Sequence, residues 1–242
     1  MNPQIDDMEA FAEKTREISE IYINAKESEV QGIHVYSTDE KMGIQAREHK
    51  NPSIAMKAGQ VERIDPEYIR HGTSGIIASR NVATGEIIAP SIQPTRTEED
   101  YAQHIRNVFE LNPEDKHIFV NDNLNTHKSE ALVCLIAEIE GIPTADLGIK
   151  GRTGILKSME TRELFLSNPL HKIQIVYTPK HCSWLNQIEC WFGIITRRLL
   201  NRRSNFLSVA DLEQKINAFI EYYNKYLKKP FQWNYKGKLL VV

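Results

Sequence analysis

Three acidic side chains, Asp39, Asp122 and Glu189, stand where they could act together on a metal ion. Asp39 and Asp122 each follow a short β-branched or aromatic run that predicts a strand, whereas Glu189 lies in a predicted helix. Clustered carboxylates repel one another, and hard divalent cations such as Mg²⁺ relieve that repulsion by binding their oxygens. Two such ions about 3.5–4 Å apart activate a water or hydroxyl and stabilise the leaving oxygen of a phosphodiester. The pattern suggests phosphodiester cleavage, although a chain with 32 Asp and Glu residues places some at strand ends by chance.

The expected local structure directs these side chains to a common edge. Ligands of α/β sheets usually bind where strands end, and both aspartates stand at such an end. Because side chains alternate along a strand, Asp122 shares its face with Ile118 and Val120 and projects from a buried face. In the predicted helix, Glu189 lies beside the apolar stripe and one turn from Asn186.

Hydrophobic periodicity and capping residues predict the elements that position these side chains. Predicted helices cover residues 8–30, 98–111, 129–140, 160–166, 183–200 and 209–227. Predicted strands cover residues 33–38, 75–82, 86–92, 118–121 and 173–177. The second and third strands form a hairpin, Ser183 is the expected N-cap of its helix, and residues 47–71 are expected to be a connecting segment. This order predicts one mixed α/β domain.

Composition is that of an ordinary globular chain, with 41% hydrophobic and 26% charged residues among 242. No stretch approaches the ~20 apolar residues of a membrane helix, and the acidic start differs from a signal peptide. Three cysteines without a Cys-x-x-Cys pair argue against a disulfide scaffold and against zinc, and favour a cytoplasmic location. Residues 179–242 carry 11 Lys and Arg against four Asp and Glu, which is consistent with a surface that faces a polyanion, although an uneven distribution of surface charge is the more typical explanation.

Longer blocks around the three acids resemble the motifs of a known family. The blocks are Thr38–Lys41 (TDEK), Asp122–Lys128 (DNLNTHK) and Tyr177–Glu189 (YTPKHCSWLNQIE). They closely resemble the catalytic blocks of mariner-type DDE transposases, best in the bacterial insertion-sequence branch of this DDE endonuclease superfamily. Lesser signatures are Arg70–Thr73 and Lys229–Trp233, and the similarity runs in the family's order from about residue 5 to residue 238.

The resemblance implies a ribonuclease H-like α/β fold, with a mixed sheet flanked by helices, and an enzyme that cleaves and joins DNA. Asp39, Asp122 and Glu189 would be its catalytic residues and metal ligands, supported by Asn186 and His127. The implied cofactor is Mg²⁺ or Mn²⁺, with two ions per active site. Water would attack a phosphodiester at the element's end, and the freed 3′-hydroxyl would attack target DNA. The implied partners are DNA and further copies of the chain, in a bacterial cytoplasm and at the nucleoid when on DNA.

We expect DNA contacts from basic and aromatic residues near these blocks. These are Lys41, Arg70, Lys128, Lys180, His181, Trp184, Arg197, Arg198, Arg202 and Arg203. Structural alternatives stand beside several of them. Arginines at a helix C-terminus also favour the helix dipole, and a Trp that opens an apolar stripe is more typical of a core. His127 is a candidate proton shuttle, but holding the loop after Asp122 by a hydrogen bond is the more typical role.

Two features depart from the family's pattern. Full-length relatives carry an N-terminal helix-turn-helix region that recognises the element's ends, and this region has no room before Asp39. We therefore expect a split-frame product, a degraded element or an excised domain, which would depend on a separate helix-turn-helix polypeptide. The interval of 67 positions between Asp122 and Glu189 is also longer than usual, and the excess maps to residues 141–171. The glycines of that segment favour a flexible connection over a phosphate-binding loop.

The expected organisation is therefore a single catalytic domain over residues 1–242, with residues 1–30 as a helical lead-in and 141–171 as an insertion. Two rival functions stay open. One is a plain metal-dependent nuclease or ribonuclease with the same fold. The long third block argues against this function, because ordinary ribonucleases lack it. The other is an inactive transposase relic that acts only by protein–protein or DNA association. The presence of all three acids argues against this alternative.

Overall fold

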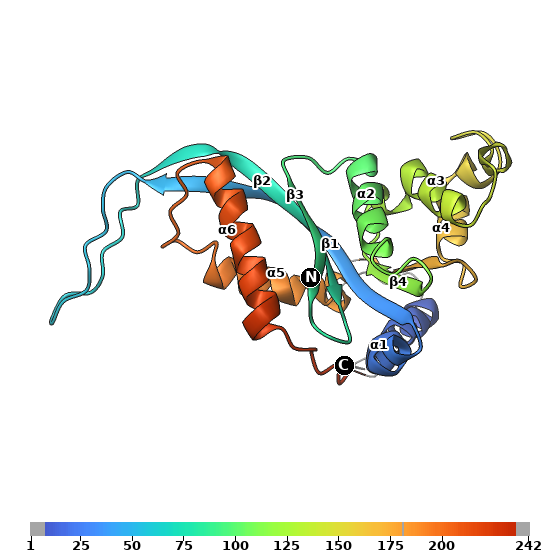
Figure 1. The fold of residues 1–242 in the computed structure, drawn as a ribbon, viewed down its shortest axis with the longest axis horizontal. Helices are drawn as coiled ribbons and strands as arrows, with labels where there is room; N and C mark the ends of the chain where they lie inside the picture. Colours follow the sequence, from blue (N-terminus) through green and yellow to red (C-terminus); the bar gives the residue numbers. More distant parts are fainter. Residues whose placement is uncertain (1–7, 181, 236–242) are drawn as a thin grey trace.

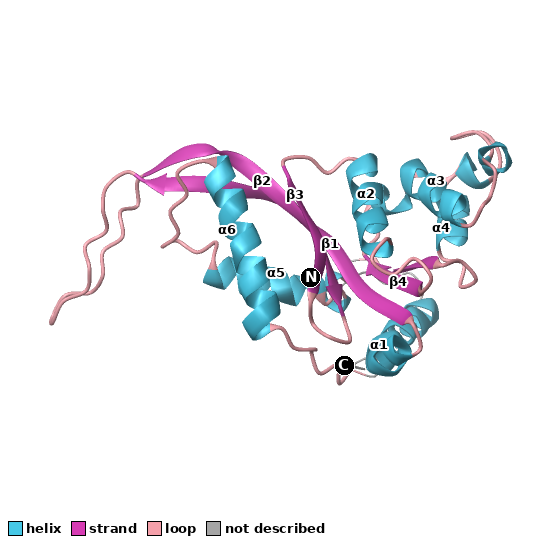
Figure 2. Ribbon diagram, viewed as in Figure 1, coloured by secondary structure: helices cyan, strands magenta, loops and turns pink. Residues whose placement is uncertain are grey.

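A five-stranded mixed sheet forms the centre of the molecule (Figures 1 and 2). The structure is a computed structural model, and it describes residues 8–180 and 182–235. Its strands are β1 (Ile33–His49), β2 (Tyr68–Asn81), β3 (Ile87–Gln93), β4 (Lys116–Asn121) and β5 (Ile173–Tyr177). They lie in the order β3-β2-β1-β4-β5; β1, β2 and β3 are antiparallel neighbours, whereas β4 and β5 run parallel to β1. This is the ribonuclease H-like arrangement, so the expected fold class is confirmed.

Helices cover both faces of this sheet (Figure 2). They are α1 (Met8–Val30), α2 (Glu98–Phe109), α3 (Glu130–Ile139), α4 (Met159–Leu166), α5 (Ile188–Arg198) and α6 (Val209–Tyr222), which a short π-turn, η5 (Tyr223–Leu227), extends. Among the helices that the structure describes, none combines the length and apolar character of a membrane span.

Side-chain alternation divides the core between the two faces. Tyr36 of β1 and Phe119 of β4 pack against α2, α3 and α4, on what we call the α2 face. Val35 and Val120, their neighbours in sequence, point the other way and pack against α1, while Ile76 of β2 packs against α5 and α6. We call this second side the α5 face. Each strand residue near the site can therefore be assigned to a face from its position.

The first strand is much longer than predicted. The expected end at Thr38 is wrong, because β1 continues to His49 and stays paired with β2 from Asp39 opposite Ala78 to His49 opposite Tyr68. Antiparallel backbone hydrogen bonds hold this part without an apolar pattern that periodicity could detect. Parallel pairing with β4 ends at Ser37, so Asp39 lies two residues past the end of the parallel region.

Residues 50–67 continue β1 and β2 as a hairpin arm that reaches away from the main body (Figure 1). The predicted connecting segment over residues 47–71 is therefore a two-stranded ribbon. Isolated bridges pair Ile54 with Arg63 and Lys57 with Gln60 along it, and Lys50 bonds Glu67 at its base. None of these residues belongs to the hydrophobic clusters of the described chain.

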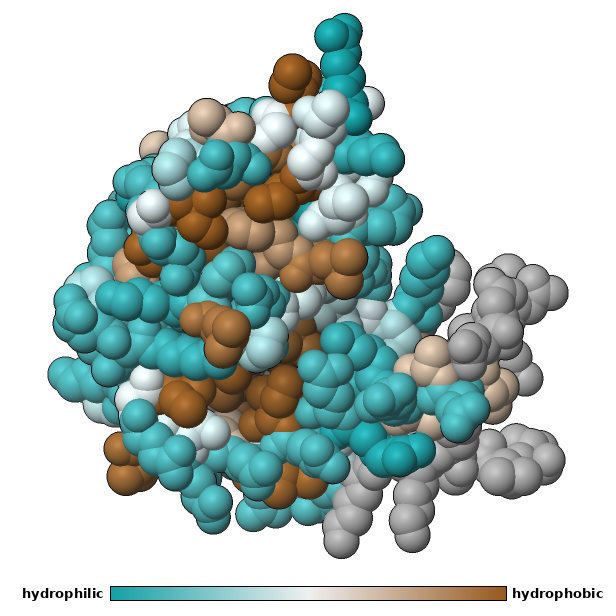
Figure 3. All heavy atoms as spheres, turned by 90° about the vertical axis from the view of Figure 1, so that its right-hand side faces the viewer, coloured by the Kyte–Doolittle hydropathy of each residue, from teal (hydrophilic) through white to brown (hydrophobic). Residues whose placement is uncertain are grey.

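Residues 141–171 are ordered, which makes the expected flexible connection wrong. The segment contains the 3₁₀ turns η2 (Thr144–Leu147) and η3 (Ile155–Lys157) and then α4. It buries Leu147, Leu156 and Leu166 in the core of the α2 face. Its exposed Lys150 forms surface ion pairs with Glu98 and Glu130. Figure 3 views the molecule from this side and shows hydrophobic side chains scattered among hydrophilic ones.

Candidate active site

Asp39 and Asp122 meet at the end of the parallel part of the sheet. Asp122 directly follows β4, and alternation puts it on the α5 face with Ile118 and Val120, both of which contact the α1 core. Asp39 lies on the same face of β1, is 7% exposed, and is close enough to Asp122 for the two charges to interact. The first two predicted acids are therefore brought together by parallel pairing between strands that are distant in sequence.

Asn186 ties the start of α5 to the same strand. Its buried Nδ2 donates to the backbone oxygen of Thr38 at 2.9 Å and to Asp39 Oδ2 at 3.3 Å, and its Oδ1 accepts from the Ser37 hydroxyl. The backbone N–H of Ile188, the first residue of α5, donates to Ser37 Oγ at 2.8 Å. Glu189 follows in the first helical turn with an exposed side chain, on the side of the sheet where Asp39 lies.

The predicted N-cap of this helix is wrong. Ser183–Leu185 form a separate 3₁₀ turn, η4, and α5 begins only at Ile188. The difference arises because the Asn186 side chain and the Ile188 backbone bond β1 instead of continuing a helix from Ser183. The result is a helix whose first turn is anchored to the strand that carries Asp39.

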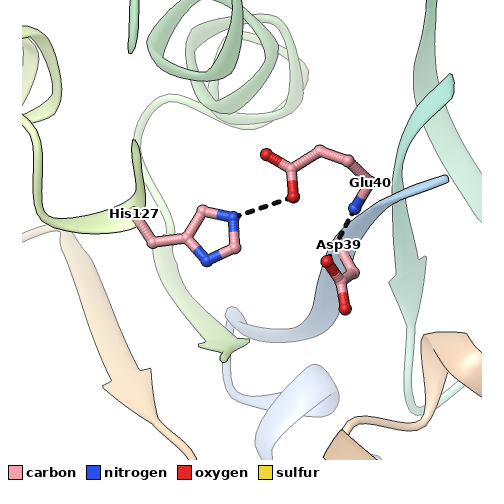
Figure 4. Close-up of side chains that lie close together, drawn as sticks. All are labelled: Asp39, Glu40 and His127. Atoms are coloured by element: carbon pink, nitrogen blue, oxygen red, sulfur yellow. Dashed lines mark hydrogen bonds and ion pairs between the residues drawn. The ribbon is translucent and has the colours of Figure 1, made fainter. Parts of the chain in front are cut away.

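His127 links Asp122 to a fourth acid, Glu40, which was missed as a site residue. His127 lies in η1 (Asn125–Lys128), and its Nδ1 is 2.9 Å from Asp122 Oδ1 while its Nε2 is 3.1 Å from Glu40 Oε2. Figure 4 shows the Glu40 side chain reaching across to the ring, and Asp39 leaving β1 in another direction. Both His127 and Glu40 are buried, with side chains 0% and 1% exposed. Asp39, Glu40 and His127 each bring one ligand atom within 4.8 Å of the others.

The charges of this network are interdependent. Burial alone would lower the pKa of His127, but its hydrogen bonds to Asp122 and Glu40 and their negative charges raise it to about 10. Burial opposes ionisation of Glu40 and Asp122, yet the hydrogen bond to His127 and its charge lower the pKa of each. Arg96, before α2, adds a smaller lowering at Asp122. The network therefore contains two carboxylates and one imidazolium.

Asp39 is the acid that this network does not neutralise. Burial and the negative charge of Asp122 raise the pKa of Asp39 to about 8, despite the hydrogen bond from the Glu40 backbone N–H. Asp122 Oδ2 makes no hydrogen bond among the described residues, and the exposed Glu189 carboxylate forms no ion pair there. A divalent cation would relieve the repulsion between Asp39 and Asp122 and use these free oxygens. The oxygens of Asp39 and Asp122 thus suit a hard metal ion, whereas no contact among the described residues joins Glu189 to them.

The predicted DNA contacts occupy different surroundings. Lys180 is exposed beside Asp122 and lines a depression with it, and Trp184 is 51% exposed, so the core alternative for this Trp is wrong. Lys128 is buried, donating to Asn123 and Glu163 at 2.7 Å each, and its ammonium lies over the Tyr177 ring. Lys41 lies over the Phe192 ring on the α5 face.

The remaining cations lie farther along the same elements. Arg197 and Arg198 end α5, and Arg202 and Arg203 follow it, with Arg203 bonded to Glu62 of the hairpin arm at 2.7 Å. Arg70 is exposed on β2 opposite Arg47, near the base of that arm. His181 lies outside the described residues. Of the predicted DNA contacts that the structure describes, Lys180 alone lines the depression with Asp122.

Sequence reasoning missed Glu40, Arg96 and Ser37 as parts of the site. Glu40 stands inside the TDEK block, but a charged residue in a strand gives no signal of burial. Ser37 reads as an ordinary strand residue, and its partners are 149 and 151 positions away. Arg96 lies in a Thr-rich loop with no motif. All three depend on tertiary contacts that local sequence patterns do not encode.

The model of one protein family, the DDE superfamily endonuclease, matches residues 34–213, a segment that includes Asp39, Asp122 and Glu189. The chain belongs to this family. No curated protein matches this sequence.

Solved structures agree with its fold. It is similar to chains in "Crystal structure of the Mos1 mariner paired end complex with Mn", with 13% identity, in "Mos1 transposase paired-end complex with left transposon end", with 14%, and in "Crystal structure of a pre-cleavage Mos1 transpososome", with 14%. Each comparison has a TM-score of 0.53, and the three cover 91%, 92% and 91% of this chain, respectively. This chain spans 59% of the length of each Mos1 chain. At these identities the likeness supports a shared fold.

Proposed function

We propose that this chain is the catalytic domain of a mariner-type DDE transposase that cleaves and joins DNA with divalent metal ions. The observation that carries the proposal is the meeting of Asp39 and Asp122 on one face of the sheet, with Asn186 anchoring the helix of Glu189 to the same strand. Membership of the DDE endonuclease family supports the reaction class. The Mos1 complexes, whose descriptions name transposon ends and Mn, support DNA and a metal as partners.

Asp39, Asp122 and Glu189 are the proposed ligands of the metal, and we propose two ions. When bound, Mg²⁺ or Mn²⁺ would activate an attacking oxygen and stabilise the leaving oxygen of a phosphodiester. The protein's own residues hold the ligands in place: Asn186 Nδ2 orients the Asp39 carboxylate, and His127 orients that of Asp122. A preorganised set of carboxylates avoids the cost of assembling it during the reaction.

Two reactions are proposed for this site. In hydrolysis, the oxygen of water attacks the phosphorus at an element end, the bond to the 3′ oxygen breaks, and a 3′-hydroxyl is released beside a 5′-phosphate. In strand transfer, that 3′-hydroxyl attacks a target phosphorus and displaces the target's 3′ oxygen. Lys180, exposed beside Asp122, is suited to contact the DNA backbone close to the scissile bond, and the exposed Trp184 is suited to stack on a base.

The proposal also covers the origin of the chain, its location and its partners. We propose a bacterial insertion-sequence origin, a cytoplasmic and nucleoid location, and an active complex with several copies of the chain. A separate helix-turn-helix polypeptide is the proposed source of end recognition. The Arg197–Arg203 region is the proposed sequence-independent DNA contact, together with the net positive charge of residues 179–242.

The test is nicking of supercoiled plasmid with Mn²⁺ by the wild type and by Asp122→Asn. We expect the variant to lose at least about a hundredfold in rate, because a metal ligand supplies several kcal/mol of transition-state stabilisation. The matched control is Asp146→Asn, which changes an exposed acid in η2 and should nick at the wild-type rate.

Each result bears on the rival functions. Nicking that is equal in the wild type and Asp122→Asn would overturn the proposed site. Nicking without any joining of a 3′-hydroxyl end to plasmid would favour a plain nuclease. Absence of nicking together with absence of Mn²⁺ binding in calorimetry would favour the inactive relic that acts by association.

A further inference from the structure

Glu40 is a buried acid for which the proposed reaction has no direct use. It lies on the α2 face of β1, opposite to Asp39, and its side chain is 1% exposed. Glu40 Oε2 faces His127 Nε2 at 3.1 Å, while Oε1 is buried and has no hydrogen-bond partner among the described residues. Burying a carboxylate is costly, and a pair of buried charges is weak evidence for a gain in stability. The position of Glu40 therefore calls for a functional explanation.

The surroundings hold His127 in one orientation. Its ring packs on that of Tyr101, with centroids 4.3 Å apart, and the Tyr177 hydroxyl donates to its backbone oxygen at 2.7 Å. Nδ1 faces Asp122 Oδ1 at 2.9 Å and Nε2 faces Glu40 Oε2 at 3.1 Å, so the two nitrogens face two carboxylates. The imidazole is thus a rigid bridge that joins Glu40 on the α2 face to Asp122 at the end of β4.

We propose that Glu40 is a positioning residue that acts through His127 to fix the Asp122 carboxylate. With Oδ1 held by His127 and by the Leu124 N–H, at 2.9 Å each, Oδ2 is left as the oxygen available to a divalent ion. This inference rests on the proposed function, in which Asp122 is a metal ligand. Residues that orient metal ligands in this way commonly change metal affinity by about 10–100-fold when they are lost.

A direct metal ligand is the competing role for Glu40. Asp39, Glu40 and His127 present ligand atoms within 4.8 Å of one another, which would admit an ion between them. The geometry argues against this role, because both His127 nitrogens already face carboxylate oxygens, Nδ1 at 2.9 Å from Asp122 and Nε2 at 3.1 Å from Glu40. The two roles predict different couplings between Glu40 and His127.

The first experiment is calorimetric titration of Mn²⁺ into the wild type, Glu40→Ala and Glu40→Gln. We expect Glu40→Ala to weaken Mn²⁺ binding about tenfold or more. Glu40→Gln keeps an oxygen that accepts from His127 Nε2, so it should weaken binding less. This isosteric variant also serves if Glu40→Ala does not fold. Unchanged affinity in both variants would overturn the proposal.

A double-mutant cycle separates positioning from direct ligation. In a His127→Gln background, we expect Glu40→Ala to change Mn²⁺ affinity by less than about twofold, because the route from Glu40 to Asp122 is already broken. The same loss in both backgrounds would show that Glu40 binds the metal itself and would overturn the positioning role.

A matched control exists on the same strand. His34, near the start of β1, also bridges two carboxylates, with Nδ1 3.1 Å from Glu29 and Nε2 2.9 Å from Asp115. Glu29→Gln changes the same chemistry at the end of β1 away from the site, and it should leave Mn²⁺ affinity at the wild-type value.

A crystal structure of metal-free Glu40→Ala decides the proposal without any metal readout. We expect the His127 ring to turn and its 2.9 Å contact with Asp122 Oδ1 to be lost. An unmoved ring and carboxylate would overturn the positioning role. If the wild type binds no Mn²⁺, the proposed function fails, and this comparison still tests whether Glu40 holds Asp122.

Discussion

At the scale of single residues, the site brings several carboxylates close together, and only some of them are paired with a positive charge. His127 stands between Glu40 and Asp122 and favours their ionised forms, but Asp39 faces Asp122 without a cation of its own. The fold thus stores repulsion at Asp39, where the donor set is also most suited to a divalent ion. Carboxylates whose repulsion costs free energy without a metal ion, and is relieved when one binds, are typical of residues arranged for function rather than for stability.

His104 gives a prediction at the same scale. It lies on α2 with both ring nitrogens near hydroxyls, Nε2 2.9 Å from Ser79 Oγ and Nδ1 3.1 Å from Ser91 Oγ. Burial lowers the pKa of His104 to about 4, so below pH 6.5 the unfolded chain takes up a proton that the folded chain does not. Its contribution to stability is therefore complete above pH 6.5 and is lost as the pH falls toward 4.

The measurement is urea unfolding between pH 7 and pH 4.5 for the wild type and His104→Gln. We expect the wild type to lose on the order of 3 kcal/mol more than the variant over this range, since one pKa unit corresponds to about 1.4 kcal/mol. Parallel pH profiles would show that His104 does not titrate as a buried neutral group.

At the scale of elements, the link between β1 and α5 positions the third acid. Ser37 Oγ accepts from the first N–H of α5 and donates to Asn186, whose amide in turn holds Asp39. One hydroxyl thus sets the distance between a strand and a helix that are far apart in sequence. The orientation of Glu189 depends on this contact, because Glu189 follows Ile188 directly.

Ser37→Ala tests the link. Loss of the hydroxyl leaves the buried Ile188 N–H without its acceptor, which costs about 1–3 kcal/mol of unfolding free energy. We also expect plasmid nicking to fall by more than the stability change explains, since α5 loses its anchor. The control is Ser19→Ala, where an equally buried hydroxyl donates only to the Thr15 carbonyl within α1, and both properties should stay close to wild type. Equal behaviour of the two variants would mean that the link carries no special role.

Elements with a strong local pattern could be predicted from the sequence, and those set by distant contacts could not. The strand over 173–177 was predicted with its observed bounds, because a run of β-branched and aromatic residues, interrupted only by Gln174, ends shortly before Pro179. An N-cap at Thr97 with acidic residues after it predicted the start of α2 correctly, and the structure shows that Thr97 and Asp100 form a capping box there. The polar half of β1 gave no such pattern, because its structure depends on pairing with β2.

The same limit applies to the site. The three acids were proposed from strand ends, helix faces and motif blocks. Glu40 was missed because its burial depends on His127, 87 positions away. Whether the three acids bind metal stays a prediction.

At the scale of the whole molecule, the hairpin arm is a separable feature. It leaves the body as a two-stranded ribbon, exposes Ile54, Met56 and Val61, and adds nothing to the hydrophobic clusters of the described residues. Stability therefore comes from the two helix-covered faces of the sheet, and the arm is free to serve another purpose.

Replacing residues 51–66 by Asn-Gly tests this separation. Lys50 and Glu67 already pair through a backbone hydrogen bond of 3.2 Å, so a two-residue turn can close the hairpin at this point. We expect the unfolding free energy to stay within about 1 kcal/mol of wild type, because shortening a loop costs little. A loss of about 3 kcal/mol or more in thermal or urea unfolding would show that the arm packs on the body.

The parallel pairing of β1, β4 and β5 has a consequence for the chain as it is made. Ile33 pairs with Lys116, and His117 pairs with Ile173. The parallel strands can therefore pair only after long stretches of chain have been synthesised. Asp39 and Asp122 emerge first, but Asn186, α5 and Glu189 come after β5. The proposed catalytic centre is therefore incomplete on the ribosome until the last strand and α5 have emerged, and a truncated product would carry two of the acids without the third.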